Sequence, residues 1–217
     1  MTVTVGDIVS GARKILSDDD EVRWTNAELI LWLNDCYSVL PQVKPSECTV
    51  GEELTLIAGT KQSIPSDAER LVDITHNTAG ELGAIEVITR KELNSALPGW
   101  HGEPGTEDIE RYVSDEMAPK EFFVYPPAPS NAKVYAYTIK VPESHSRIFA
   151  VSEDLPISVK DSLAPMLIDY ILFRAFSKDA DNASYANRAG LHLNSFNMQA
   201  DAGFKLELAT SPNAEAN

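Results

Sequence analysis

The chain has 217 residues, 43% of them hydrophobic and 24% charged, so it is long enough to bury a sizeable core without disulfides or metals. Its 33 acidic and 18 basic residues give a net charge of -15, which argues against affinity for nucleic-acid phosphates because that affinity depends on Lys and Arg. There is neither an apolar run near the roughly 20 residues of a membrane span nor a secretory signal pattern, so we expect a soluble chain with no membrane partner.

The N-terminal segment is predicted to be a helix over residues 5–16. Apolar side chains recur there at three-and-four spacing, and Thr4 with Asp7 forms a cap pair. Residues 17–21 carry four successive carboxylates but lack the alternate spacing, the glycine and the distant glutamate of a calcium loop. We therefore predict a solvated connection rather than a cation site.

The most strongly patterned stretch is a helix predicted from about Thr25 to Leu40. Thr25 and Glu28 have the spacing of a capping box, Trp24 can pack against the first turn, and Pro41 cannot continue the hydrogen-bond ladder. The apolar face of this helix is broad and requires partner helices from elsewhere in the chain. It comprises Leu29, Trp32, Leu33, Cys36, Tyr37 and Leu40.

Between residues 42 and 155 the periodicity changes to short alternating runs separated by Gly, Pro and Asn, which predicts an inserted β-rich module. Three hairpins are expected. They pair residues 54–57 with 61–65, residues 71–75 with 84–88, and residues 121–125 with 133–141. A capping box at Thr89 opens a short helix that stops at Pro98.

Aromatic residues gather in the last two predicted strands, at Phe122, Phe123, Tyr125, Tyr135 and Tyr137. In the final strand neither face is clearly polar, so one face is a candidate partner surface. Three interpretations stay open: ordinary core, a subunit interface, or a platform for stacking on sugars. The candidate interface residues are Phe122, Tyr125, Tyr135 and Tyr137.

From residue 158 the helical period returns, and a helix that is apolar nearly all round is predicted at the centre of a bundle, with a start or kink at Pro165. A last helix is predicted over residues 183–208, and residues 209–217 are expected to form a flexible tail. The expected fold is α+β. A helical bundle is formed by residues 1–41 and 156–208, and the β-rich module of residues 42–155 is inserted into it.

The sequence contains no established catalytic or metal-binding motif, and its four histidines lack metal-ligand spacing, so we expect no catalytic residue, cofactor or metal. His192 is interpreted as a packing histidine. The most enzyme-like loop combines Trp100, His101 and Glu103, although a structural turn anchored by Trp100 is the favoured interpretation. Cys36 and Cys48 are expected to be reduced thiols rather than a disulfide.

Several stretches, in order over most of the chain, resemble the head-to-tail adaptor proteins of short-tailed bacteriophages, of the tail tubular protein A type. Each motif alone is mostly packing chemistry, and their order is the specific part. The stretches are Trp24–Thr25 with Leu29, Trp32–Asp35 and Tyr37, Gln62–Pro65 followed by Arg70–Ile74, Pro98–His101, Phe122–Pro127, Asp169–Asp179, and Arg188–Ala189 with His192 and Phe196.

The resemblance implies a virion structural protein, assembled in the host cytoplasm, that forms a ring of twelve copies between the portal protein and the tail nozzle protein. Genomic DNA would pass through the lumen without specific binding, which an acidic lumen would allow. The positions carried over are scaffold positions and imply no catalysis. They are Trp24, Thr25, Glu28, Trp32, Tyr37, Trp100, Tyr170, Arg174 and Phe196.

Two other functions compete with this hypothesis. A polysaccharide-acting enzyme could use the loop of Trp100, His101 and Glu103 together with the aromatic strands. A soluble regulatory module that binds a host protein is the third possibility, and it predicts a monomer indifferent to the portal.

Overall fold

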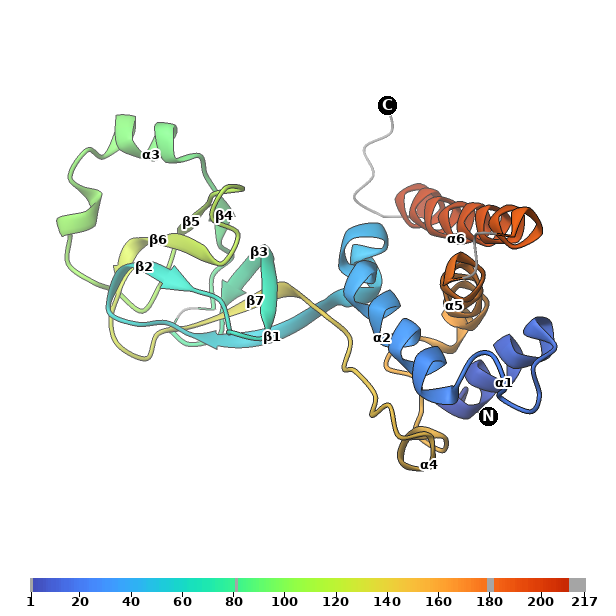
Figure 1. Cartoon of the computed structure of the whole chain (residues 1–217). Coiled ribbons are helices and arrows are strands. Elements are labelled where there is room, and N and C mark those ends of the chain that lie inside the picture. Colours follow the sequence, from blue (N-terminus) through green and yellow to red (C-terminus); the bar gives the residue numbers. More distant parts are fainter. Residues whose placement is uncertain (1, 81, 179–181, 211–217) are drawn as a thin grey trace. The chain divides into compact units, whose positions relative to one another are not determined.

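In the computed structural model (Figure 1), residues 2–80, 82–178 and 182–210 are described, with backbone only at 203, 204 and 206–210. The chain divides into two compact units. Met1–Glu47 with Pro142–Asn217 forms a helical unit, and Cys48–Val141 forms a β-rich unit. Helices and two sheets together confirm the α+β class. The predicted assignment of domains, with boundaries near residues 41 and 155, stays a prediction.

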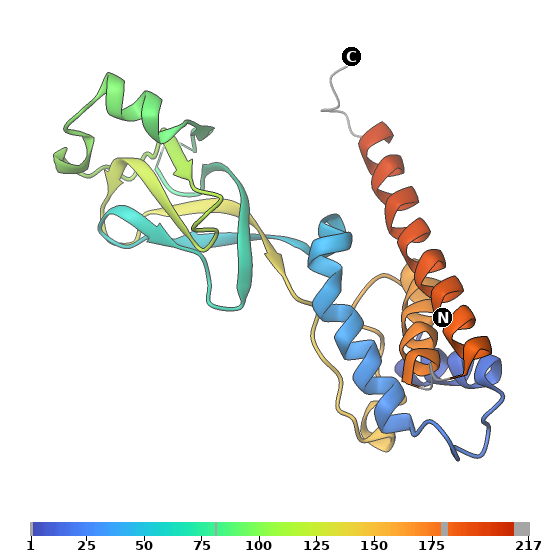
Figure 2. The same cartoon turned by 45° about the horizontal axis from the view of Figure 1, so that its top comes forward.

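The helical unit is built around α5 (Ala164–Lys178), which contacts α1 (Val5–Leu16), α2 (Asn26–Val43) and α6 (Ala183–Thr210). Figures 1 and 2 show α5 between α6 and the N-terminal helices. A short helix, α4 (Phe149–Ser152), and 3₁₀ turns at Pro45–Cys48 and Asp161–Leu163 complete the unit. The central position predicted for an all-round apolar helix is confirmed, and Pro165 lies in its first turn as expected.

The helix starts follow from side-chain caps. The predicted capping boxes at Thr4, Thr25 and Thr89 are all present, each with its carboxylate three residues later accepting from the cap backbone. The end predicted for α2 is wrong, because Pro41 lies inside the helix, which continues to Val43. Only one ladder bond is lost at Pro41, and the Lys44 N–H still donates to the Leu40 carbonyl at 2.8 Å.

The acidic connection after α1 is not simply solvated. The Asp18 side chain is about 10% exposed and accepts from the backbone N–H groups of Val22, Arg23 and Trp24. The Arg13 guanidinium approaches the same carboxylate at 3.6 Å. This carboxylate therefore fixes the turn that leads into α2. The sequence did not predict this role, because Asp18 is one of four successive acidic residues.

At the C-terminal end, α6 extends to Thr210, two residues beyond the predicted end. The predicted tail of residues 209–217 thus begins inside the helix, and from residue 211 on it lies outside the described residues. Along α6, Ala189 and Phe196 are buried, and Tyr185, His192 and Leu193 are partly buried.

The β-rich unit contains two sheets. One has the order β1-β7-β3, from Thr49–Thr55, Lys133–Lys140 and Ala68–Asn77. The other has the order β2-β6-β5-β4, from Gly59–Ser63, Glu121–Ala128, Arg111–Ser114 and Glu86–Val87. Side chains from both sheets form one core that includes Leu54, Ile74, Phe122, Val124 and Val134. The helix α3 (Arg90–Ala96) and a 3₁₀ turn at Trp100–Gly102 lie between β4 and β5.

The first and third predicted hairpins are wrong as pairs. β1 pairs with β7 and β2 with β6, while β6 and β7 lie in different sheets. The second is present only in part: the Ile85 N–H donates to the Thr75 carbonyl at 3.0 Å, and an isolated antiparallel bridge joins His76 and Ala84. Strands that follow one another in the sequence, such as β1 and β2 or β6 and β7, lie in different sheets. The two sheets bury one face each against the other.

Two further differences concern β5 and β6. Residues 111–114 were not predicted as a strand, yet β5 pairs antiparallel with β6. β6 was predicted to end at Pro126, but it continues to Ala128. Proline has no N–H to donate, but the hydrogen bonds at this end of β6 use its carbonyl groups. The Tyr125 and Pro127 carbonyls accept from the N–H groups of Glu110 and Thr106.

Candidate interaction surfaces

The Trp100 loop is a packed turn. Trp100 is 1% exposed and packs with Leu93 and Val113, while its indole N–H donates to Asn94 Oδ1 at 2.9 Å. His101 stacks on the indole with ring centroids 3.7 Å apart, and its Nδ1 lies 2.8 Å from Thr60 Oγ1. A ring buried in this way has no free face for a sugar.

The third member of the loop, Glu103, accepts from the Tyr125 hydroxyl at 3.1 Å. The pKa of Tyr125 is raised, first by desolvation and then by this carboxylate. This contact ties the loop to β6. Trp100 is therefore not available as an aromatic platform for the enzyme hypothesis.

The scaffold residues Trp24, Glu28 and Arg174 take part in contacts that join α2 and the residues before it to α5. The Trp24 indole N–H donates to the Ala175 carbonyl at 3.2 Å, and Lys178 Nζ lies 2.6 Å from Glu28 Oε1. Arg174 Nη1 lies 2.8 Å from Asp35 Oδ2.

Other scaffold residues fill the helical core. Trp32 is 6% exposed, and Tyr37 is fully buried with its hydroxyl accepting from the Ser158 N–H at 3.2 Å. Tyr170 packs on Phe196 across α5 and α6, with ring centroids 5.2 Å apart. These positions account for packing and offer no reactive group.

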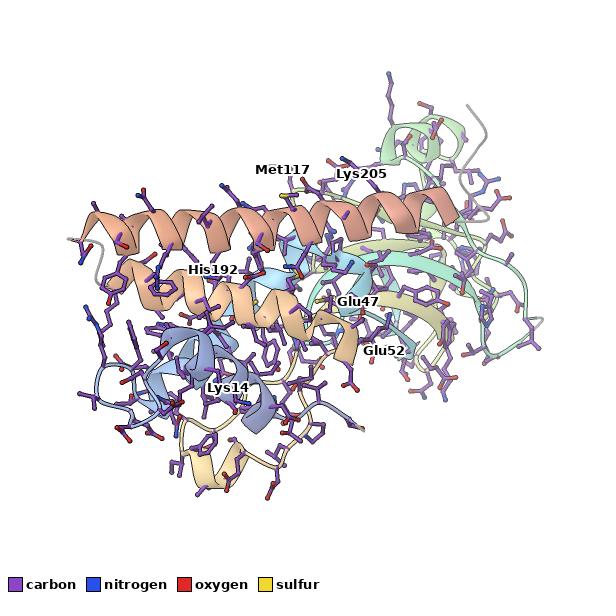
Figure 3. All side chains as sticks on the ribbon, turned by 90° about the vertical axis from the view of Figure 1, so that its right-hand side faces the viewer. Lys14, Glu47, Glu52, Met117, His192 and Lys205 are labelled. Atoms are coloured by element: carbon purple, nitrogen blue, oxygen red, sulfur yellow. The ribbon has the colours of Figure 1, made fainter. Side chains whose placement is uncertain are left out.

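One polar cluster resembles a hydrolase triad in composition but not in geometry. His192 Nδ1 lies 2.8 Å from Asp169 Oδ1, and Figure 3 shows this histidine extending from α6 toward α5. Ser195 and Gln199 both donate to the other carboxylate oxygen, at 2.6 and 2.7 Å. The serine is hydrogen-bonded to the acid rather than to the imidazole, so the histidine cannot serve as its base. His192 also stacks on Phe176, as expected of a packing histidine.

A second histidine, which the sequence gave no reason to select, lies where the chain returns to the helical unit. His145 Nε2 lies 3.4 Å from the Tyr37 hydroxyl and 3.2 Å from Ser158 Oγ. The Asn34 amide both donates to and accepts from the His145 backbone, at 2.8 Å each. Burial lowers the pKa of His145. The cluster secures the returning segment to α2.

The candidate interface aromatics separate into three environments. Phe122 is fully buried in the β core, so its side chain does not reach the surface. Tyr125 packs partly buried against the Trp100 cluster. Tyr135 and Tyr137 lie on the outer face of the β1-β7-β3 sheet, where Tyr137 is 38% exposed and the rings meet edge to face. Only this last pair presents a surface.

Exposed aliphatic side chains mark another surface on the helical unit. Ile148, Val151 and Leu155, around α4, are 66%, 59% and 44% exposed. No group of His, Cys, Asp or Glu in the described ranges is arranged to hold a metal ion. Both cysteines are buried, and neither is part of a disulfide. Among the helices of these ranges, none has the length and apolar character needed to cross a bilayer.

Comparison with protein families gives one result that covers almost the whole chain. Residues 3–214 match the model of the SU10 adaptor protein family. No curated protein matches the chain. A structural role agrees with the contacts described above, in which the scaffold residues pack in the cores and the polar clusters around His192 and His145 connect helices and loops. The chain belongs to the SU10 adaptor protein family and is a phage adaptor-type structural protein of the virion.

Proposed function

We propose that this protein is a head-to-tail adaptor of the tail tubular protein A type. It forms a ring of twelve copies between the portal protein and the tail nozzle protein, and it assembles there in the host cytoplasm. The observation that carries the proposal is the family match over residues 3–214.

The division into two units supports this role. A ring requires two different complementary patches on each subunit, because each copy contacts its neighbours head to tail. The exposed Tyr137 lies in the β-rich unit, and Ile148 and Val151 lie in the helical unit. Two compact units in one chain offer separate surfaces for such contacts.

Charge supports the passage of DNA. A net charge of -15 repels phosphates, so a ring lined by this chain would let the genome slide without being retained. Screening limits this repulsion to about 8 Å at physiological salt, which is enough for a duplex filling a narrow lumen.

The test is the native mass of the protein, alone and mixed with the portal protein of the same genome. We expect a large ring, or a stoichiometric complex that forms only with the portal, because rings of this kind can depend on a template. A monomer that ignores both portal and nozzle proteins would contradict the proposal and favour the regulatory-module hypothesis.

A further inference from the structure

The strand β1 has an open edge. It forms the outer strand of its sheet and pairs with β7 in an unbroken register from Thr49 to Thr55. Within the described residues of the β-rich unit, no strand pairs with its other side. Long, regular edges are normally blunted by bulges, prolines or cover, because unpaired backbone groups recruit other strands. β1 contains no proline and no bulge.

Hydrogen bonds at the end of the ladder identify which backbone groups face outward. The Leu56 N–H donates to the Ala132 carbonyl at 2.8 Å, so even-numbered residues of β1 bond toward β7. In an antiparallel pair, alternate residues direct both backbone groups to one neighbour. Gly51, Glu53 and Thr55 therefore direct their N–H and C=O groups away from β7.

An aromatic surface borders the middle of this edge. A Cβ atom on Gly51 would lie 2.6 Å from the Tyr135 hydroxyl and 2.9 Å from Tyr137 Cε1, so the two rings occupy the space above the glycine. His76 stacks on Tyr135 with ring centroids 5.4 Å apart. A strand added to β1 would thus place one side chain against the tyrosine rings and the next residue on that face near Glu53, whose carboxylate pairs with Lys133 Nζ at 2.6 Å.

We propose that β1 is a docking edge for an extended segment of another virion protein, which adds as a fourth strand beside Gly51, Glu53 and Thr55. The segment carries an apolar residue against Tyr135 and Tyr137. Main-chain bonds supply affinity in this mode, and the side chains supply specificity. The inference rests on the proposed adaptor role.

A second copy of this chain is the less suitable occupant. Pairing β1 with β1 of another copy is two-fold symmetric and stops at two subunits, and it brings together two chains of charge -15. The other edges fit poorly. β4 has two residues, β2 is irregular between Gly59 and Lys61, and β3 is contacted along its outer side by backbone groups of Ile85 and Pro119.

The test compares two proline variants in binding to the purified portal and nozzle proteins of the same genome. Glu53→Pro removes an outward N–H, together with the carboxylate that pairs with Lys133 at 2.6 Å. It leaves the backbone ladder to β7 intact, because proline is tolerated where the N–H faces solvent. Val87→Pro is the matched control on β4, where the neighbouring residues Glu86 and Ile88 donate to β5. We expect Glu53→Pro to weaken binding to one of the two proteins at least tenfold and Val87→Pro to bind as the unmodified chain does.

Hydrogen exchange of the unmodified chain decides the matter if Glu53→Pro does not fold. The amides of Gly51, Glu53 and Thr55 should become protected when the partner is added, while the Val87 amide does not change. Unchanged exchange, or unchanged affinity of a folded Glu53→Pro, would overturn the docking edge. Protection that rises with concentration of the chain alone would assign the edge to a second copy. If the unmodified chain binds neither protein, the adaptor role itself fails.

Discussion

Asp18 Oδ2 accepts a hydrogen bond from the Trp24 N–H at 2.9 Å, immediately before the capping box of α2. The indole N–H of Trp24 donates separately to the Ala175 carbonyl of α5. One carboxylate in an acidic run therefore fixes the entry into α2. The bonds from Trp24, Arg23 and Val22 N–H groups hold the pKa of Asp18 below its ordinary value.

Asp18→Asn should lower the melting temperature at pH 7 and change its pH dependence. Because the folded pKa is depressed, the carboxylate contributes stability above its ordinary pKa of about 3.9 and loses it as pH falls through the lower folded value. The difference in melting temperature between the two proteins should therefore shrink below about pH 4. Asp19→Asn, at an exposed neighbour, is the control. Identical melting curves for the two variants would contradict this role.

Trp100→Ala should destabilise the β-rich unit by about 3–5 kcal/mol, the usual effect of removing a large buried side chain. The indole is 1% exposed and also loses its bond to Asn94. Urea unfolding followed by far-UV circular dichroism measures the change. His101→Ala, which removes an exposed ring, should have a much smaller effect. Equal midpoints for the two variants would mean that the turn does not depend on Trp100.

Asn77→Ala should destabilise the β-rich unit, because the buried Asn77 side chain satisfies both backbone groups of Ile109, as a neighbouring strand would. It donates to the Ile109 carbonyl at 2.7 Å and accepts from the Ile109 N–H at 3.0 Å. Each buried group left unpaired costs about 1–3 kcal/mol. The exposed Asn197→Ala on α6 is the control, and a urea midpoint shifted no more than the control's would refute the assignment.

The pair of Arg174 and Asp35 should contribute little to stability. Their side chains are 37% and 34% exposed, and exposed ion pairs contribute about 0–1 kcal/mol. A double-mutant cycle with both residues changed to Ala should give a coupling energy in that range. Phe196→Ala, at a 2% exposed position, should cost about 3–5 kcal/mol by contrast. A coupling energy above 2 kcal/mol would make the ion pair a principal helix contact.

The sequence by itself determined the local elements. α1 and α3 begin at their predicted Thr caps and α2 at Thr25, because a hydroxyl and a carboxylate three residues apart satisfy backbone donors within one turn. The periodicity of α5 likewise predicted a central helix, since all-round apolarity requires neighbours on every side. The structural role of Trp100 followed from a tight turn with one large side chain.

Only the tertiary structure decided how the strands pair, because a strand's pattern states which face is buried and not which edge it joins. The first and third hairpin predictions failed for this reason, and Asn77 and His145 could not be found because their partners lie far away in sequence. The surface of Tyr135 and Tyr137 also depends on pairing, since Gly51 lies beneath the rings only when β1 is placed beside β7. Contacts within one turn can be predicted from sequence spacing. Contacts between elements depend on how the whole chain folds, because their partners are distant in sequence.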